Sequence, residues 1–415
     1  MKNLNIMSKV NKNIRLFLTV NIIASFAMGI FNMLIGIYLK ELGYKEHFVG
    51  MVLSINTFSI ALSSIPSAYL LEKIGRKKSL AIGFLCIAIG SSFIVLLNNK
   101  LLIIAMSILV GTGLSVKTTA EGMYITENTT EEERVFAFSV NFIIFNAGMM
   151  IASFIGGVLS SYISNFLTSA QSITLIFISS AILSMTGLIP IQFMKEPESL
   201  KPRSLKSCIK GYIKILNKKV LEFMTYNFLI GLGAGVVVPF FSVYLKYSMN
   251  IEDNIVGTIL SISQFGCIVC GGLVPFLSNK LGKVKTVILC QILSIPFLVS
   301  IAFPQGLILV TISFFIRNGL MNMAIPLTQN LSMELVDKSE RTNLSSFLSL
   351  SSNISRAMGI AIGGFMMEKI SYNSPYYLTI VLYVMGIIIF SFIYKDDLKK
   401  EKIKTHSCKK VNSIG

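Results

Sequence analysis

Twelve apolar segments, each long enough to cross a lipid bilayer, constrain the fold of this chain more than any other feature. A membrane-spanning helix needs about 20 predominantly apolar residues. We therefore predict an all-α membrane protein with twelve transmembrane helices. The first six lie near residues 16–39, 48–71, 79–98, 101–126, 136–162 and 169–193, and the second six near 221–245, 254–278, 286–304, 306–333, 343–367 and 375–394.

The composition excludes several other classes of protein. Only 14% of the 415 residues are charged, whereas a soluble domain carries roughly a quarter, so a water-soluble enzyme is excluded. The net charge of +17 lies outside the apolar segments, and we expect no nucleic-acid partner. Six cysteines and two histidines are scattered along the chain, which predicts no disulfide framework, no metal site and no cofactor. Cys267 and Cys270 sit inside an apolar run and are interpreted as packing residues.

The basic residues predict the orientation in the membrane. They gather in alternate loops, above all in 73–78, 195–219, 280–285 and the tail 395–410. Cytoplasmic loops carry such an excess of Lys and Arg. We therefore expect a multi-pass protein of the cell membrane with both termini and the central loop in the cytoplasm. In that loop, lysines recur every fourth residue from Lys206 to Lys218, which predicts an amphipathic helix on the lipid surface or a plain solvated linker.

The two halves repeat each other at a shift close to 207 residues. Lys73 and Gly75 recur as Lys280 and Gly282, and the pair Gly156-Gly157 recurs as Gly363-Gly364. Six spans per copy give both copies one orientation, as in transporters built from parallel repeats that rock against each other. The predicted domains are a six-helix bundle over 1–194, a basic linker over 195–219, a second bundle over 220–395 and a basic tail over 396–415.

The turn after the second span carries a motif. The stretch from Ala68 to Lys78 reads A-Y-L-L-E-K-I-G-R-K-K and resembles the signature G-x-x-x-D-R-x-G-R-R/K of the major facilitator superfamily. The resemblance implies a twelve-span transporter, similar to bacterial drug and metabolite efflux members, in which this turn stabilises the outward-facing state. The predicted conformational residues are Glu72, Lys73, Gly75, Arg76 and Lys77, with Gly282 in the second copy.

Residue chemistry suggests a role for each part of this motif. Gly75 supplies a left-handed turn where the helix ends, and the basic residues that follow anchor the turn at lipid phosphates. Glu72 faces a helix N-terminus or pairs with a cation.

Two glycine pairs form a further element. Gly156 and Gly157 resemble part of the antiporter motif of the family's drug:proton exchangers, and Gly363 and Gly364 form a second, degraded copy. Small residues at such spacing bring helices close together. They therefore indicate general packing or an element specific to export.

Four charges fall inside the predicted spans, where an ionisable side chain defaults to a functional hypothesis. They are Lys117 and Glu121 in the fourth span, Arg317 in the tenth and Arg356 in the eleventh. The resemblance implies that all these spans line the transport cavity. Glu121 is interpreted as a proton-coupling acid or as the structural partner of Lys117, one helical turn away. The arginines retain their charge, so they bind solute rather than carry protons.

The excess of cations favours an anionic or zwitterionic solute. Four asparagines are candidate polar partners along the pathway: Asn21, Asn32, Asn146 and Asn353.

The sequence thus predicts a secondary active transporter that exports a small organic solute by alternating access in exchange for protons. It contains no nucleotide-binding P-loop, which argues against ATP as the direct energy source. We expect a monomer whose partners are the lipid bilayer, the solute and protons. The alternatives are an importer or symporter of the same fold, a non-transporting membrane sensor and a membrane-embedded enzyme, although the spans offer no catalytic grouping.

Overall fold

The computed structural model describes residues 11–97, 99–196, 214–337 and 340–398. This part of the chain consists of helices joined by short turns, without a strand. The helices of the first half are α2 (Lys12–Glu41), α3 (Glu46–Ile74), α4 (Arg76–Leu96), α5 (Lys100–Glu127), α6 (Glu131–Ile163), α7 (Ser169–Thr186) and α8 (Leu188–Phe193). Those of the second half are α10 (Lys218–Val237), η1 (Val238–Phe240), α11 (Phe241–Val243), η2 (Tyr244–Ser248), α12 (Asp253–Leu281), α13 (Lys283–Ala302), α14 (Leu307–Met333), α15 (Arg341–Lys369) and α16 (Ser374–Ile393).

Each predicted span coincides with a helix or with a helical run. Within the described residues, eleven helical segments are long and apolar enough to cross a membrane. The remaining predicted span is α15, which has 29 residues but is less apolar than the others. The sixth span consists of α7 and α8, which are separated by Gly187, and the seventh passes through 3-10 and π turns after Val237. The prediction of an all-α membrane fold with twelve spans is confirmed.

Helix starts follow local capping chemistry. Thr130 and Thr168 each form a capping box with the residue three positions on, Glu133 and Gln171. The Asn99 side chain accepts from the first turn of α5. These side chains satisfy backbone N–H groups that have no partner inside the helix, so α5, α6 and α7 each begin at a defined residue.

The chain forms two compact units. The first contains Met1–Leu205 together with Pro239–Ser261, and the second contains Lys206–Val238 together with Ile262–Gly415. An ion pair joins the segment Pro239–Ser261 to α2, because Lys246 Nζ lies 3.0 Å from Glu41 Oε1. Lys246 Nζ also lies 2.9 Å from Asp253 Oδ1 within the same segment. This grouping follows contacts, whereas the boundaries drawn from the sequence follow the repeat.

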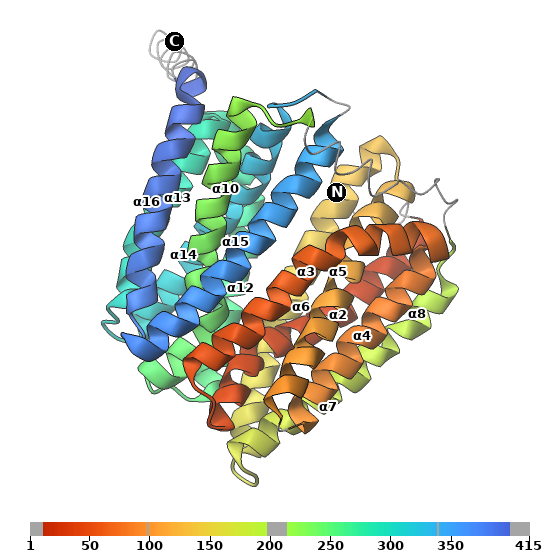
Figure 1. Ribbon diagram of the computed structural model, residues 1–415, viewed down its shortest axis with the longest axis vertical. Helices are drawn as coiled ribbons and strands as arrows, with labels where there is room; N and C mark the ends of the chain where they lie inside the picture. The colour runs from red at the N-terminus through yellow and green to blue at the C-terminus, as the bar shows by residue number, and fades with distance from the viewer. Residues whose placement is uncertain (1–10, 98, 197–213, 338–339, 399–415) are drawn as a thin grey trace, which may run out of the picture. The chain divides into compact units, whose positions relative to one another are not determined.

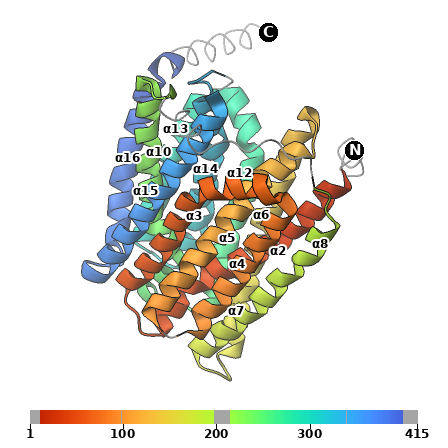
Figure 2. The same cartoon turned by 45° about the vertical axis from the view of Figure 1, so that its right-hand side comes forward.

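Both units use the same pattern of helix pairs. In the first, α2 packs against α6 and α7, while α4 packs against α5 and α7; in the second, α10 packs against α15 and α16, while α13 packs against α14 and α16. Figure 1 shows α10 running alongside α15 and α16, and Figure 2 shows α2, α4 and α7 from a second direction. The repeated neighbours confirm the internal duplication.

Buried aromatic and aliphatic side chains fill each unit. The core of the first includes Phe17, Phe84 and Tyr124, and that of the second includes Phe223 and Phe390. Many large apolar side chains remain exposed on the outer helix faces. That arrangement is expected of a protein whose solvent is lipid.

The central linker falls mostly outside the described residues. The linker is described again from Lys214, which is followed by Ile215, Leu216 and the cap Asn217. Lys214 Nζ lies 3.1 Å from Glu340 Oε1. The predicted amphipathic helix and most of the basic tail lie outside the described part of the chain.

Candidate functional site

The turn between α3 and α4 depends on a glycine. Gly75 has φ 91° and ψ 161°, a backbone region that is essentially restricted to glycine. This is an extended conformation with positive φ, rather than the left-handed helical turn expected from the sequence. A Cβ at this position would lie 2.5 Å from Glu196 Oε1, so a side chain here would displace the Glu196 carboxylate.

The residues around Gly75 correct the role expected for Arg76, one member of the basic cluster. Arg76 is only 2% exposed, and its guanidinium binds Glu127 at the end of α5, with Nε–Oε2 3.1 Å and Nη2–Oε1 2.6 Å. Arg76 therefore turns into the protein instead of toward lipid phosphates. The Glu196 carboxylate accepts from the backbone N–H groups of Arg76 and Lys77. It occupies the N-terminus of α4, where negative charge is favourable.

The second copy of the turn has the same backbone and weaker contacts. Gly282 has φ 90° and ψ 157°. Lys283, the repeat mate of Arg76, lies 2.9 Å from Glu334, the repeat mate of Glu127. Both side chains are about half exposed, at 44% and 54%. The ion pair is thus conserved between repeats while its burial is not.

A polar chain crosses three helices of the first unit. Lys117 Nζ donates to Glu121 Oε2 at 2.7 Å and lies 4.7 Å from the ring centre of Phe145. The other carboxylate oxygen of Glu121 accepts from Asn141 of α6, and Asn141 accepts from Asn21 of α2. Lys117 and Asn21 are buried, whereas Glu121 is half-buried. The structure therefore places the Glu121 carboxylate between Lys117 and Asn141 in a hydrogen-bonded chain that ends at the buried Asn21.

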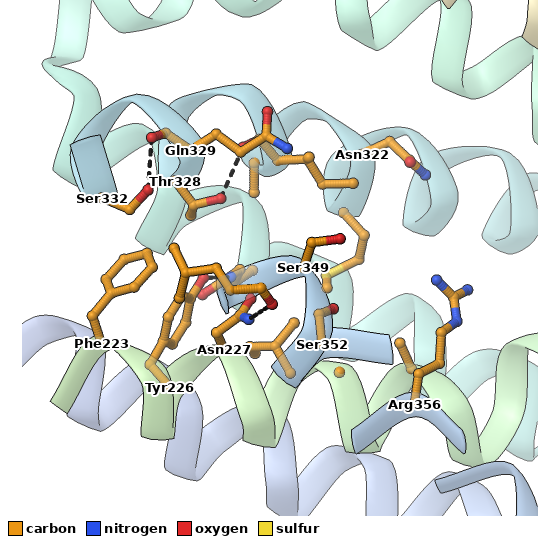
Figure 3. A pocket seen from close by; sticks show the side chains of 18 of the residues that line it. Phe223, Tyr226, Asn227, Asn322, Thr328, Gln329, Ser332, Ser349, Ser352 and Arg356 are labelled. Carbon is orange, nitrogen blue, oxygen red and sulfur yellow. Dashed lines mark hydrogen bonds between the residues drawn. The ribbon is translucent and has the colours of Figure 1, made fainter. Parts of the chain in front are cut away.

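The second unit contains a pocket of about 440 Å³, a size typical of small-molecule sites. Half of its 24 lining residues carry neutral hydrogen-bonding side chains. Among the described residues that line it, none is Asp or Glu. In Figure 3, side chains of α14 lie on one side of the space and those of α10 and α15 on the other.

Both predicted arginines line this pocket. Arg317 is 2% exposed, and its Nη2 donates to the Tyr383 hydroxyl at 3.0 Å. Arg356 is exposed, and its guanidinium extends from α15 toward the side formed by α14 (Figure 3). Residues from two spans thus place two cations at one pocket whose lining contains no carboxylate among the described residues.

The other predicted residues are dispersed. Asn32 is exposed on α2. Asn146 and Asn353 donate to carbonyl groups of their own helices, at Phe142 and Ser349. The structure therefore unites Asn21, Lys117 and Glu121 in one cluster and the two arginines in another. It leaves these three asparagines outside both clusters.

The motif residues and glycine pairs have distinct surroundings. Glu72 is half-buried and Lys73 is exposed. A side chain at Gly156 would collide with Ile30 of α2, and one at Gly157 with the first turns of α12. Gly363 and Gly364 are buried in α15. Close helix packing explains Gly156 and Gly157 without reference to the direction of transport.

Several contributing residues were missed in the sequence. Glu127 and Glu334 are separated by the repeat shift of 207, so comparison of acids between halves would have found them. Ser345, Ser349, Ser352 and Arg356 lie at helical spacing in α15 and all line the pocket. Periodicity would have found that stripe. Asn141 and Tyr383 carry no comparable signal, because their importance depends on helix rotation.

The fold and the polar pocket define a polytopic membrane transport protein. The sequence model of the protein family described as the Major Facilitator Superfamily matches residues 17–222 and 223–414, which is nearly the whole chain in two halves. The chain belongs to this superfamily.

Comparison with individual proteins adds similarities in sequence and fold. The Bacillus subtilis protein YwtG is 27% identical over 158 residues, 38% of this chain and 33% of its own length. The quinolone resistance protein NorA of Staphylococcus aureus is 25% identical over 178 residues, 42% of this chain and 45% of its own length. These alignments thus span only a third to about half of each relative.

Solved structures show the same fold over most of the chain. The nucleoside transporter NupG aligns with a TM-score of 0.76 at 14% identity, covering 93% of this chain and 99% of that structure. A D-xylose-proton symporter aligns with a TM-score of 0.74 at 12% identity, covering 91% and 97%.

Proposed function

We propose that this chain is a secondary active transporter that exports a small anionic or zwitterionic solute in exchange for protons. The observation that carries the proposal is the pocket of the second unit. Arg317 and Arg356 line it, and no Asp or Glu does so among the described residues. Two guanidinium groups at one pocket favour a carboxylate or phosphate through charge-assisted, often bidentate hydrogen bonds.

Glu121 is the proposed proton site. Its two carboxylate oxygens accept from Lys117 and Asn141. A proton on Glu121 would replace the attraction to Lys117 and release that ammonium group. Proton binding would therefore change the contacts of α5 with α6, and through Asn141 those with α2.

The proposal includes the placement in the membrane. We assign the protein to the cell membrane as a monomer, with both termini and the linker over 195–219 in the cytoplasm. The functional halves are the six-helix bundles over 1–194 and 220–395, followed by the tail over 396–415. The alternating basic loops support this orientation.

Transport in proteoliposomes containing an entrapped pH dye tests the proposal. The probes are D-gluconate and D-glucose 6-phosphate, which cross lipid poorly, and norfloxacin, a carboxylate-bearing quinolone suggested by the likeness to NorA. For exchange, solute entry should drive protons out, so the lumen should become alkaline. Acidification would instead indicate a symporter. Absence of any protein-dependent signal with all three probes would contradict the transport proposal.

Glu121→Gln tests the assignment of the proton site. The variant should lose proton movement while retaining exchange of labelled solute for unlabelled solute, because exchange requires no net protonation. Glu252→Gln, at an exposed acid before α12, serves as the matched control and should behave like the unmodified protein. Proton-coupled flux through Glu121→Gln would show that Glu121 only pairs with Lys117.

A further inference from the structure

The walls of the second-unit pocket have an unusual chemistry for a site inside a membrane bundle. On α14, the polar side chains Asn318, Asn322 and Gln329 line the space; on α15, Ser345, Ser349 and Ser352 do so. Amides and hydroxyls each offer both a donor and an acceptor. The pocket therefore presents a hydrogen-bonding surface next to its two arginines.

Some of these hydroxyls differ from ordinary serines in membrane helices. Ser355 of α15 donates to the carbonyl of Ser352 at 2.9 Å, the usual way in which a helix satisfies a hydroxyl. Within the described residues, no such bond is formed by the side chains of Ser349 and Ser352. Both hydroxyls line the pocket (Figure 3), so they are available to a bound molecule.

The repeat shows that the fold does not require this polar wall. A shift of 207 residues places Ser345, Ser349, Ser352 and Arg356 on Phe138, Phe142, Phe145 and Met149 of α6. The two helices occupy equivalent positions, since α6 packs on α2 as α15 packs on α10. The same fold therefore accepts apolar side chains at all four of these positions. The polar side chains at the four α15 positions are thus explained by a ligand that binds them rather than by the fold.

We infer that the pocket binds a polyhydroxylated anion, that is, a sugar acid or sugar phosphate, rather than an apolar carboxylate. This inference rests on the proposed transport function and specifies its solute class. The anionic group contacts Arg356, and the hydroxyls bridge the Gln329 amide of α14 and the serines of α15. A ligand without hydroxyls would displace water from these groups without replacing the hydrogen bonds, which is costly. Sites built to bind hydroxyls reject analogues that lack them.

Binding measurements on the purified full-length protein test this inference. The probes are D-gluconate and D-glucose 6-phosphate, with D-glucose as the neutral polyol and hexanoate as the six-carbon anion without hydroxyls. At least one of the two polyhydroxylated anions should bind at least tenfold more tightly than both D-glucose and hexanoate. Tighter binding of hexanoate than of either polyhydroxylated anion would overturn the inference.

Two variants separate the two recognition elements. Arg356→Gln should weaken binding of the anions at least tenfold and reduce the ratio of their affinity to that of D-glucose. The double variant Ser349→Ala/Ser352→Ala should weaken the polyhydroxylated anions at least fivefold and leave hexanoate unchanged. Ser355→Ala, which removes a hydroxyl bonded to its own helix, is the matched control and should leave all affinities unchanged. Unchanged gluconate and glucose 6-phosphate binding in the double serine variant would exclude the serine stripe.

The outcomes distinguish this inference from the proposed function. Proton-coupled transport of norfloxacin together with preferential binding of hexanoate would support the proposed transport function and contradict the inference of a polyhydroxylated solute. Selective binding of gluconate or glucose 6-phosphate without any transport would support the inferred class of ligand and contradict the proposed transport function.

Discussion

The two corner turns of the repeat share their backbone and differ in how their charges are buried. Gly75 and Gly282 have nearly identical φ and ψ angles, and an ion pair follows each at equivalent positions. In the first turn, Arg76 is buried and binds both oxygens of Glu127. In the second, Lys283 forms a half-exposed contact with Glu334. Duplication has therefore kept the geometry and concentrated the ionic stabilisation in the first half.

The interior charges follow the same division. In the first half, Lys117 pairs with Glu121. In the second half, the arginines line a pocket whose described lining includes no acid. We infer that cations of the first half mainly maintain structure or respond to protons, whereas cations of the second half meet the solute.

Removing the buried cation of the first turn should produce the largest effect. Arg76→Gln leaves the partly buried Glu127 without its partner, and breaking a buried pair costs about 3–5 kcal/mol. Lys283→Gln removes an exposed pair, which is worth about 1 kcal/mol or less. In detergent, the unfolding temperature should fall much more for Arg76→Gln than for Lys283→Gln. Adding Glu127→Gln should recover part of the loss, and equal shifts at the two turns would refute the division.

The glycines should show a smaller difference between the turns. Valine at either position meets backbone strain of about 1–3 kcal/mol. Gly75→Val also forces a side chain against Glu196, so it should lower the unfolding temperature and the transport rate more than Gly282→Val. Gly122→Ala is the control, because that position has open space. Full transport by Gly75→Val would show that the turn needs no glycine.

The pocket arginines should have the smallest effect on stability and a measurable effect on binding. Arg356→Gln should weaken binding of the anionic probes at least tenfold, about 1.4 kcal/mol, with no fall in unfolding temperature because its side chain is exposed. Arg317→Gln should lower both the affinity for the anionic probes and the unfolding temperature, since Arg317 is buried and donates to the Tyr383 hydroxyl. A fall in unfolding temperature with unchanged affinity for Arg356→Gln would mean that this arginine fastens helices.

Much of the fold could be predicted because membrane insertion leaves a strong record in the sequence. The length of each apolar run specified the spans, and the shift of 207 residues revealed the duplication. The charges at Arg317 and Arg356 were visible because a charge inside a span is rare.

Side-chain partners could not be predicted in the same way. The sequence placed Glu72 at a helix N-terminus or beside a cation, yet Glu196, from a distant segment, occupies the N-terminus of α4. It likewise gave no reason to join Asn21 to Glu121 through Asn141. Such contacts depend on the rotation of each helix about its axis, and one apolar sequence in lipid gives little information about rotation.

The polar wall of α15 also has a consequence for biogenesis. A segment with an arginine near its centre and several serines is a poor candidate for insertion into the bilayer on its own, because a central arginine opposes insertion by about 2.5–3.5 kcal/mol. Its main packing partner, α10, precedes it in the chain. A side chain at Gly359 would collide with the backbone of α10 at Leu232, so the two helices meet closely. During synthesis, α15 therefore emerges when a complementary surface is already in the membrane. We therefore expect a larger residue at Gly359 to impair the assembly of α15 with α10 during synthesis, before any effect on solute binding could be measured.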